Sequence, residues 1–171
     1  MQTFIEYVLS NFTLTFFVLS LIVTFFRLIF AAKPLKKGLA TESFIAFYIL
    51  FNIGFMFIYN FVCHVFYAEQ AAAFIGWANS PFQYEVGYVS LGIGIAGIIA
   101  FKSNIGFRAA TILIPAVFML GAACGHISEI IQLHNFAPGN AGVMLWADIL
   151  LPIYGFILLA LKFRATGLRH H

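Results

Sequence analysis

Charged residues are scarce in this sequence. Only 9% of its 171 residues are Asp, Glu, Lys or Arg, whereas 63% are hydrophobic. Soluble domains carry roughly 25% charged residues, and a chain this apolar would expose large hydrophobic patches to water. The shortage of charge therefore excludes an ordinary soluble domain and indicates an integral membrane protein. The net charge of +3 gives no indication of a nucleic-acid partner.

Cysteine is also scarce, and the N-terminal region lacks the marks of a cleaved signal. The two cysteines, Cys63 and Cys124, form no CxxC pair, which excludes a zinc finger or a thioredoxin-like motif. No basic region precedes the first apolar run and no A-x-A-like site follows it, so we expect this run to remain as a true span. His170 and His171 are typical of an affinity-tag remnant and are left out of the chemistry.

Long hydrophobic runs, by contrast, make up most of the chain. A helix that crosses a bilayer needs about 20 mostly apolar residues. Five runs reach this length, at about 7–31, 43–67, 82–101, 107–131 and 141–162. We therefore predict an all-α integral membrane bundle of five transmembrane helices, which forms a single domain over residues 1–171. Its aromatic-rich exterior would contact membrane lipids and would suit a homo-oligomer.

The third run has two features of its own. It is rich in small residues, and these allow helices to approach closely in lipid, so we predict that it is the central, most buried helix. Its start, NSPFQYE, predicts a capping box with Ser80 as the N-cap and Gln83 at the third helical position. Trp77, just before it, and Trp146 lie at heights typical of an interfacial aromatic belt.

All basic residues fall on one side of the predicted membrane. They are Arg27, Lys33, Lys36, Lys37, Lys102, Arg108, Lys162, Arg164 and Arg169. Cytoplasmic loops of membrane proteins are enriched in Lys and Arg. With five spans, this pattern predicts an N-terminus outside and a C-terminus in the cytoplasm.

Other ionisable side chains gather toward the opposite, outer ends of four predicted helices. Counted at about 1.5 Å per residue, five of them lie within about 10 Å of those ends. They are His64, Glu85, His126, Glu129 and Asp148. Such residues cost a few kcal/mol each in lipid unless they face the bundle interior and find partners. The sequence therefore predicts a polar pocket near the outer, periplasmic side.

A metal is the first ligand that this pocket suggests. Imidazole and carboxylate together favour zinc or non-haem iron, and a single H-x-x-E motif favours one metal over a pair. The predicted metal ligands are His64, Glu85, His126 and Glu129. The residues predicted to hold the imidazoles in position are Gln83, Asp148 and Asn60. We prefer this metal to a b-type haem between the two histidines, because several carboxylates would lie beside the haem.

Two other functions fit the same residues. Clustered carboxylates beside an imidazole can relay protons, which would suit a proton-coupled transporter of small solutes. A satisfied polar cluster can also simply hold helices together, which would suit a structural or assembly protein. The sequence leaves open whether the chain is an enzyme; an enzyme would use a metal-activated water or a bound quinone, reached from the outer leaflet.

Two stretches carry a resemblance to known proteins. The segment WANSPFQYEVG (77–87), and the pair Gly125–His126 followed by NFAPGN (135–140), resemble a family of small bacterial membrane proteins classed as a domain of unknown function. More remotely, the acidic start of the third run is similar to the DoxX-like membrane proteins. The first resemblance covers most of spans 3 to 5 and none of the first span, and it implies a helical bundle in the bacterial inner membrane. The second implies an association with quinones or redox chemistry.

Overall fold

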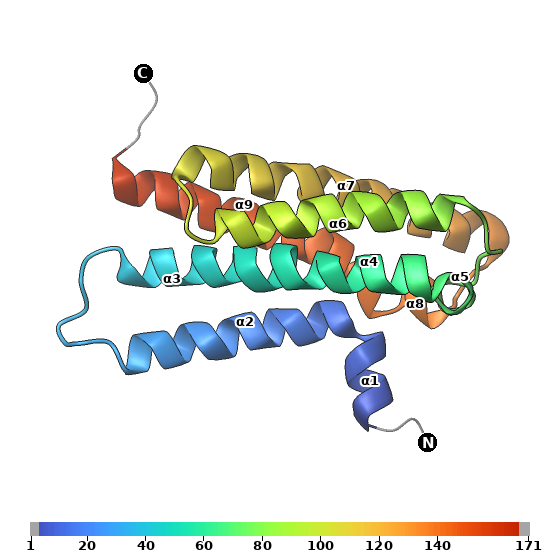
Figure 1. Ribbon diagram of the computed structural model, residues 1–171, viewed down its shortest axis with the longest axis horizontal. Coiled ribbons are helices and arrows are strands. Elements are labelled where there is room, and N and C mark those ends of the chain that lie inside the picture. The colour runs from blue at the N-terminus through green and yellow to red at the C-terminus, as the bar shows by residue number, and fades with distance from the viewer. Residues whose placement is uncertain (1–3, 168–171) are drawn as a thin grey trace.

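The chain is a bundle of helices in the computed structural model, which describes residues 4–167 (Figure 1). No strand occurs within that range. The helices are α1 (Phe4–Ser10), α2 (Phe12–Ile29), α3 (Leu39–Tyr48), the π-helical η1 (Ile49–Phe55), α4 (Met56–Phe66), α5 (Ala68–Ile75), α6 (Phe82–Ala100), α7 (Ile105–Leu133), α8 (Pro138–Ala141) and α9 (Val143–Thr166). The three segments α3, η1 and α4 run on as one continuous rod (Figure 1).

Five of these rods are long and apolar enough to cross a membrane. They are Phe12–Ile29, Leu39–Phe66, Phe82–Ala100, Ile105–Leu133 and Pro138–Ala165. Each has at least 18 residues, which approaches or exceeds the length of about 20 residues that a bilayer requires. The prediction of an all-helical bundle with five spans is therefore confirmed for the described residues.

The first span is shorter than the sequence suggested. The prediction began it at residue 7, but α2 begins at Phe12, and α1 leaves the bundle at a steep angle to it (Figure 1). Ser10 and Asn11 lie at the break, where Ser10 Oγ donates to Glu6 O (2.7 Å) and Asn11 Nδ2 donates to Tyr7 O (2.9 Å). Such local side-chain bonds to backbone carbonyls compete with a continuous helix.

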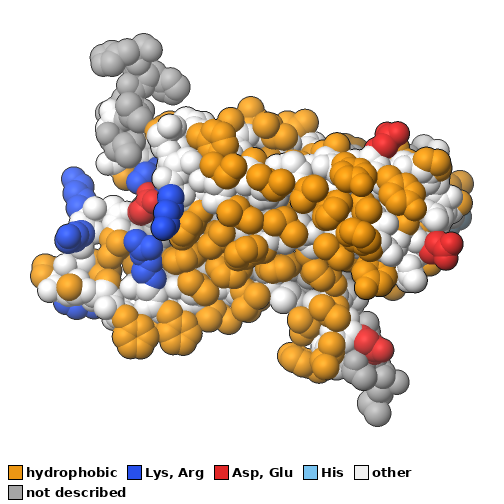
Figure 2. Space-filling model, in the orientation of Figure 1, with side chains coloured by type: hydrophobic (Ala, Val, Ile, Leu, Met, Phe, Trp, Pro, Cys, Tyr) orange, Lys and Arg blue, Asp and Glu red, His pale blue; other side chains and the backbone are white. Residues whose placement is uncertain are grey.

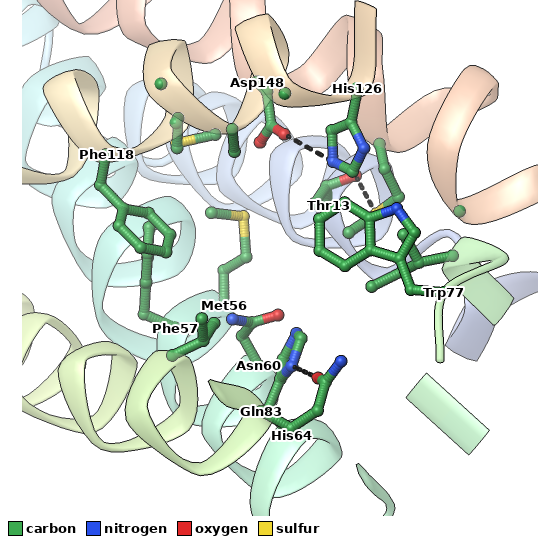
Figure 3. A pocket seen from close by; sticks show the side chains of 18 of the residues that line it. Thr13, Met56, Phe57, Asn60, His64, Trp77, Gln83, Phe118, His126 and Asp148 are labelled. Atoms are coloured by element: carbon green, nitrogen blue, oxygen red, sulfur yellow. Dashed lines mark hydrogen bonds and ion pairs between the residues drawn. The ribbon is translucent and has the colours of Figure 1, made fainter. Parts of the chain in front are cut away.

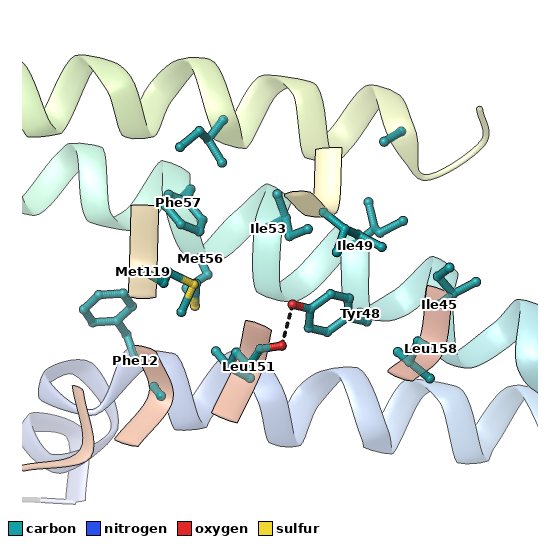
Figure 4. Close-up of a cluster of buried hydrophobic side chains, with 14 residues drawn as sticks. Phe12, Ile45, Tyr48, Ile49, Ile53, Met56, Phe57, Met119, Leu151 and Leu158 are labelled. Atoms are coloured by element: carbon teal, nitrogen blue, oxygen red, sulfur yellow. Dashed lines mark hydrogen bonds between the residues drawn. The ribbon is translucent and has the colours of Figure 1, made fainter. Parts of the chain in front are cut away.

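The most buried span is the second and not, as expected, the third. Span Leu39–Phe66 has the largest buried share of the five, and it contributes Ile45, Ile49 and Ile53 to the core. In Figure 4 these side chains lie between neighbouring helices, and Tyr48 donates its hydroxyl to Leu151 O of α9 (2.9 Å). About half of the residues of the third span face outward. Its small residues therefore allow close packing on one side of the helix and do not indicate a central position in the bundle.

That contact joins α6 to η1 and α4 through glycines. A Cβ atom on Gly97 would lie 2.5 Å from the backbone N of Gly54, and one on Gly94 would lie 3.0 Å from Gly54 O. One on Gly87 would lie 2.5 Å from Cγ2 of Val65. The two helix backbones therefore touch along this face, and the contact fixes how α6 is rotated about its axis.

The variant Gly97→Ala tests this close approach. Its new methyl group would collide with backbone atoms, which cannot move aside as a side chain can, so we expect a loss of about 1–3 kcal/mol in the free energy of unfolding in detergent micelles. Gly92→Ala is the matched control, because a Cβ there meets nothing within 4 Å. The control should be neutral or slightly stabilising, since alanine favours helix over glycine. Equal stability of the two variants would contradict the proposed contact.

The two ends of the bundle differ in charge. Figure 2 shows Lys and Arg side chains gathered at one end, around the α2–α3 connection, and acidic side chains toward the other. At the basic end, Glu42 Oε1 accepts from Arg108 Nη1 (2.8 Å) and Glu42 Oε2 accepts from Lys162 Nζ (2.6 Å). Arg169, His170 and His171, which the sequence analysis named, lie outside the described residues.

Candidate functional site

A cavity of about 410 Å³ lies inside the bundle toward the end opposite this basic cluster. Most of its wall is apolar and includes Phe12, Met56 and Phe57, which also belong to the hydrophobic core. Figure 3 shows its polar side chains on two walls, with His126 and Asp148 on one and His64 and Gln83 on the other. The core therefore ends at the cavity, and the polar residues lie where apolar packing stops.

His126, on α7, is held in place by the loop between α7 and α9. Its Nδ1 lies 2.6 Å from Oδ1 of Asn140, which is fully buried on α8. Asn140 Nδ2 in turn donates to His126 O (3.2 Å) and to Asn135 O (2.9 Å). The indole of Trp77 stacks on the imidazole, with ring centroids 5.7 Å apart. The ring orientation of His126 is thus fixed from two sides.

These bonds also fix which ring nitrogen of His126 carries hydrogen. The amide nitrogen of Asn140 must face the two carbonyl oxygens, so its Oδ1 faces His126 and accepts the hydrogen of Nδ1. The other nitrogen, Nε2, lies 3.7 Å from Oδ2 of Asp148. A bare Nε2 and a carboxylate would present two lone pairs to each other, which is unfavourable unless one of the two groups carries a proton.

Asp148, on α9, is the other unusual group of this wall. Its side chain is buried and lines the cavity. The 3.7 Å separation from His126 is too long for a hydrogen bond, and the carboxyl forms no hydrogen bond with any other residue in the range 4–167. Buried carboxyl groups without such partners are costly. A donor placed in the cavity would satisfy this one.

The opposite wall carries a second polar pair. His64, on α4, places Nδ1 2.5 Å from Oε1 of Gln83 on α6. One turn before His64, Asn60 Nδ2 donates to Ser90 Oγ (2.9 Å). Gln83 faces inward because Gly87, one turn later, lies against the His64 turn of α4. The predicted capping box does not form: Pro81 is the N-cap of α6, no side chain caps this helix, and Gln83 binds His64 instead.

The four predicted metal ligands do not come together. His64 and His126 line the cavity on different walls (Figure 3). Glu85 is exposed on the outer side of α6, and Glu129 accepts from Asn135 Nδ2 (3.3 Å) outside the cavity lining. Over residues 4–167, no group of three or more His, Cys, Asp and Glu side chains is arranged to hold a metal ion. Glu129 therefore helps to anchor a loop.

The three residues predicted to orient the imidazoles do line the cavity. They are Gln83, Asn60 and Asp148. Sequence reasoning missed Asn140 and assigned Trp77 to an interfacial belt, although both contact His126. The left-handed backbone of His134 (φ 52°) ends α7 and turns the chain toward Asn140. The motif NFAPGN, noted only for its resemblance, was the available signal for this role.

Comparison with protein families assigns the chain to one family. A model described as a family of unknown function, DUF6790, matches residues 10–167. The chain belongs to this family. The DUF6790 match covers all five spans, including the first two, on which the expected resemblance did not rest. Neither the curated proteins nor the solved structures gave a match. Membership in DUF6790 supplies no activity, so function has to be inferred from the cavity, and the similarity to DoxX-like proteins stays an expectation.

Proposed function

We propose that the protein binds a small, mainly apolar organic molecule in the cavity within its membrane-spanning bundle. The carrying observation is the buried carboxyl of Asp148, which lines the cavity and forms no hydrogen bond with the described residues. Ligand cavities typically measure roughly 300–1,000 Å³ and combine apolar walls with a few polar groups. A volume of about 410 Å³ with polar pairs on two walls supports this class of ligand.

An organic ligand suits the cavity better than the single zinc or non-haem iron expected from the sequence. A protein metal site needs three or four ligands around one point. His64 and His126 belong to different walls, and each is already paired through Nδ1 with an amide oxygen. Glu85 is exposed. The donors in the cavity are thus arranged to meet separate parts of one molecule.

A substitution that fills part of the cavity with a larger side chain tests the proposal. Ala122 of α7 lines the cavity, whereas Ala110 of the same helix is exposed and does not. We expect wild-type protein purified in mild detergent to release a bound apolar compound on solvent extraction, detected by mass spectrometry in an amount close to that of the protein. Ala122→Phe should lose the compound because the ring occupies its space, and the control Ala110→Phe should keep it.

Two outcomes would count against the proposal. One is a wild-type extract that contains no compound beyond the detergent and bulk lipid found in Ala122→Phe. The other is a stoichiometric metal in the same sample that disappears in His126→Ala, which would favour the metal site predicted from the sequence. If neither ligand nor metal is found and His126→Gln changes stability alone, the cluster only holds helices together.

Proton-coupled transport is a second candidate, favoured by two observations. The His126–Asp148 pair can hold one proton beside the cavity. Asn52 of η1, one turn before the cavity residue Met56, has both amide atoms buried without a hydrogen bond to the described residues, and π-helical turns are frequent at functional sites. Flux into liposomes driven by a pH gradient, and lost in Asp148→Asn, would support transport over simple binding.

We also propose an orientation and a location. The basic end of the bundle faces the cytoplasm, and the cavity lies toward the periplasmic side of a bacterial inner membrane. The concentration of Lys and Arg at one end supports the orientation, and the resemblance to small bacterial membrane proteins supports the location. Cysteine labelling from each side of sealed vesicles, at Lys36 and at Asn79, would check it.

A further inference from the structure

Some of the residues that line the cavity, on α6 and α7, are themselves exposed. Gly121 and Gly125, one turn apart on α7, both line the cavity and are both exposed. A Cβ atom on either glycine would meet nothing within 4 Å. Phe82, at the start of α6, also lines the cavity and is 59% exposed. Exposed residues in the wall of a cavity indicate where it opens, and the place marked by these three is here called the α6–α7 portal.

The portal lies at the depth of the lipid chains. With 29 residues, α7 is about 43 Å long at 1.5 Å per residue, so it extends beyond a hydrocarbon core of about 30 Å. Gly125 and Gly121 lie about 12 and 18 Å before its end at Leu133. If α7 overhangs the core equally, by about 6–7 Å at each end, both glycines lie inside it. In that position a molecule dissolved in the bilayer would reach the cavity without entering water.

The charges around the cavity select the head group of such a molecule. Asp148 is buried there without a hydrogen bond, and no Lys or Arg is among the described residues that line the cavity. A phosphate would meet a carboxyl without a compensating cation. A hydroxyl can donate to Asp148 while it accepts from a protonated Nε2 of His126, or donate to either group alone.

We infer that the ligand is a bilayer lipid with an uncharged, hydroxyl-bearing head group that enters through the α6–α7 portal. This inference rests on the proposed function and names its ligand class. The head lies between the His126–Asp148 wall and the His64–Gln83 wall, and the apolar chain leaves past Gly121 and Gly125 into the membrane. Small residues are needed at these two positions because the chain crosses α7 there.

Tryptophan fluorescence can follow this entry. The chain has two tryptophans, of which Trp77 lines the cavity and Trp146 is exposed and does not. Trp146→Phe therefore leaves Trp77 as the single reporter. The probes are diacylglycerol and phosphatidic acid with the same brominated chains, added at equal mole fraction to protein in detergent micelles. Bromine quenches indole fluorescence on contact, so quenching above a tryptophan-only peptide in the same micelles reports occupancy of the cavity.

We expect diacylglycerol to quench Trp77 with an apparent affinity about tenfold or more above that of phosphatidic acid, because one hydrogen bond to a buried carboxyl group is at stake. Asp148→Leu should reduce this preference. In stopped-flow measurements, Gly121→Leu with Gly125→Leu should slow quenching severalfold. Gly92→Leu is the matched control, since Gly92 is exposed, has the same free space and lies away from the cavity.

Each part of the inference can fail separately from the proposed function. Equal quenching by the two lipids would overturn the uncharged head group. Unchanged rates in the double glycine variant would overturn the portal. Quenching by neither lipid, while solvent extraction still yields a bound compound that Ala122→Phe loses, would overturn the lipid but leave the cavity as a binding site. Extraction without any compound would instead overturn the proposed function.

Discussion

Replacing Asn140 by alanine should destabilise the protein by about 3–5 kcal/mol, because several buried polar groups lose their partner at once. Asn140 is fully buried, accepts from His126 Nδ1 and donates to the carbonyl oxygens of His126 and Asn135. Each buried group left without a partner costs about 1–3 kcal/mol. The free energy of unfolding in mixed micelles measures the loss. The freed imidazole should also lose its orientation, so retention of the extracted ligand should fall.

Asn140→Asp makes this prediction specific to the direction of the hydrogen bonds. Aspartate keeps an acceptor for His126 Nδ1 but places oxygen where Nδ2 now donates to two carbonyls, so we expect nearly the same loss as for alanine. Asn79→Ala is the control, because Asn79 is exposed and forms no hydrogen bond with residues 4–167; its change should stay within about 0.5 kcal/mol. An Asn140→Asp variant as stable as wild type would show that the assigned amide orientation is wrong.

The depth of each polar residue in the membrane could be predicted from the sequence. The side of the helix on which each residue lies could not. Counting residues from a helix end gives depth in the membrane, and this placed His64, His126 and Asp148 at the level of one cavity. Rotation about the helix axis needs an apolar face and a polar face. Helices that are apolar nearly all round carry little of that signal, so the prediction treated every polar residue as facing inward.

Glu85 was predicted wrongly as an inward-facing ligand because of that assumption, since its side chain is exposed. Residues two apart on a helix lie about 200° apart around its axis, so Gln83 and Glu85 cannot both face the cavity. The glycines decide between them. Gly87 lies one turn after Gln83, and it meets α4 beside His64. The small residues of α6 therefore indicated the inward side, on which Gln83 lies. The prediction of a central helix uses the number of these small residues, whereas their positions around the helix axis carry the information on rotation.

The loop residues could not be placed for a different reason. Asn140 lies on the short helix α8 and Trp77 lies in the connection between α5 and α6, and both contact His126 of α7. Their positions follow from the tertiary contacts between α5, α8 and the end of α7, including the bond from Asn135 Nδ2 to Ile75 O (3.0 Å). Hydropathy and spacing carry no information on such contacts, whereas they were sufficient for the five spans.

The basic residues at one end of the bundle predict the orientation of the protein in the membrane. In the structure, two of them, Arg108 and Lys162, also join four spans. Arg108, in the first turn of α7, donates from Nε to Ala100 O (3.0 Å) and from Nη2 to Phe101 O (2.5 Å), the carbonyls of the last residue of α6 and of its C-cap. Its Nη1 binds Glu42 of α3, and Glu42 also binds Lys162 of α9. One guanidinium thus satisfies a helix C-terminus and an ion pair together.

Replacing Arg108 by alanine should therefore cost about 2–4 kcal/mol in the free energy of unfolding, because two carbonyl groups at the end of α6 lose their buried donor at about 1–3 kcal/mol each, whereas partly exposed Glu42 keeps Lys162. Arg108→Lys should recover less than half of this loss, because one ammonium on a flexible stem cannot reach three acceptors in different directions. Lys102→Ala provides the control, since Lys102 is exposed at the same end and should change stability by less than about 0.5 kcal/mol. Unfolding by denaturant in mixed micelles would rank the three variants. If Arg108→Lys were as stable as wild type, charge alone would be sufficient at this position, and the fork-like hydrogen bonds of the guanidinium would have no part in joining the spans.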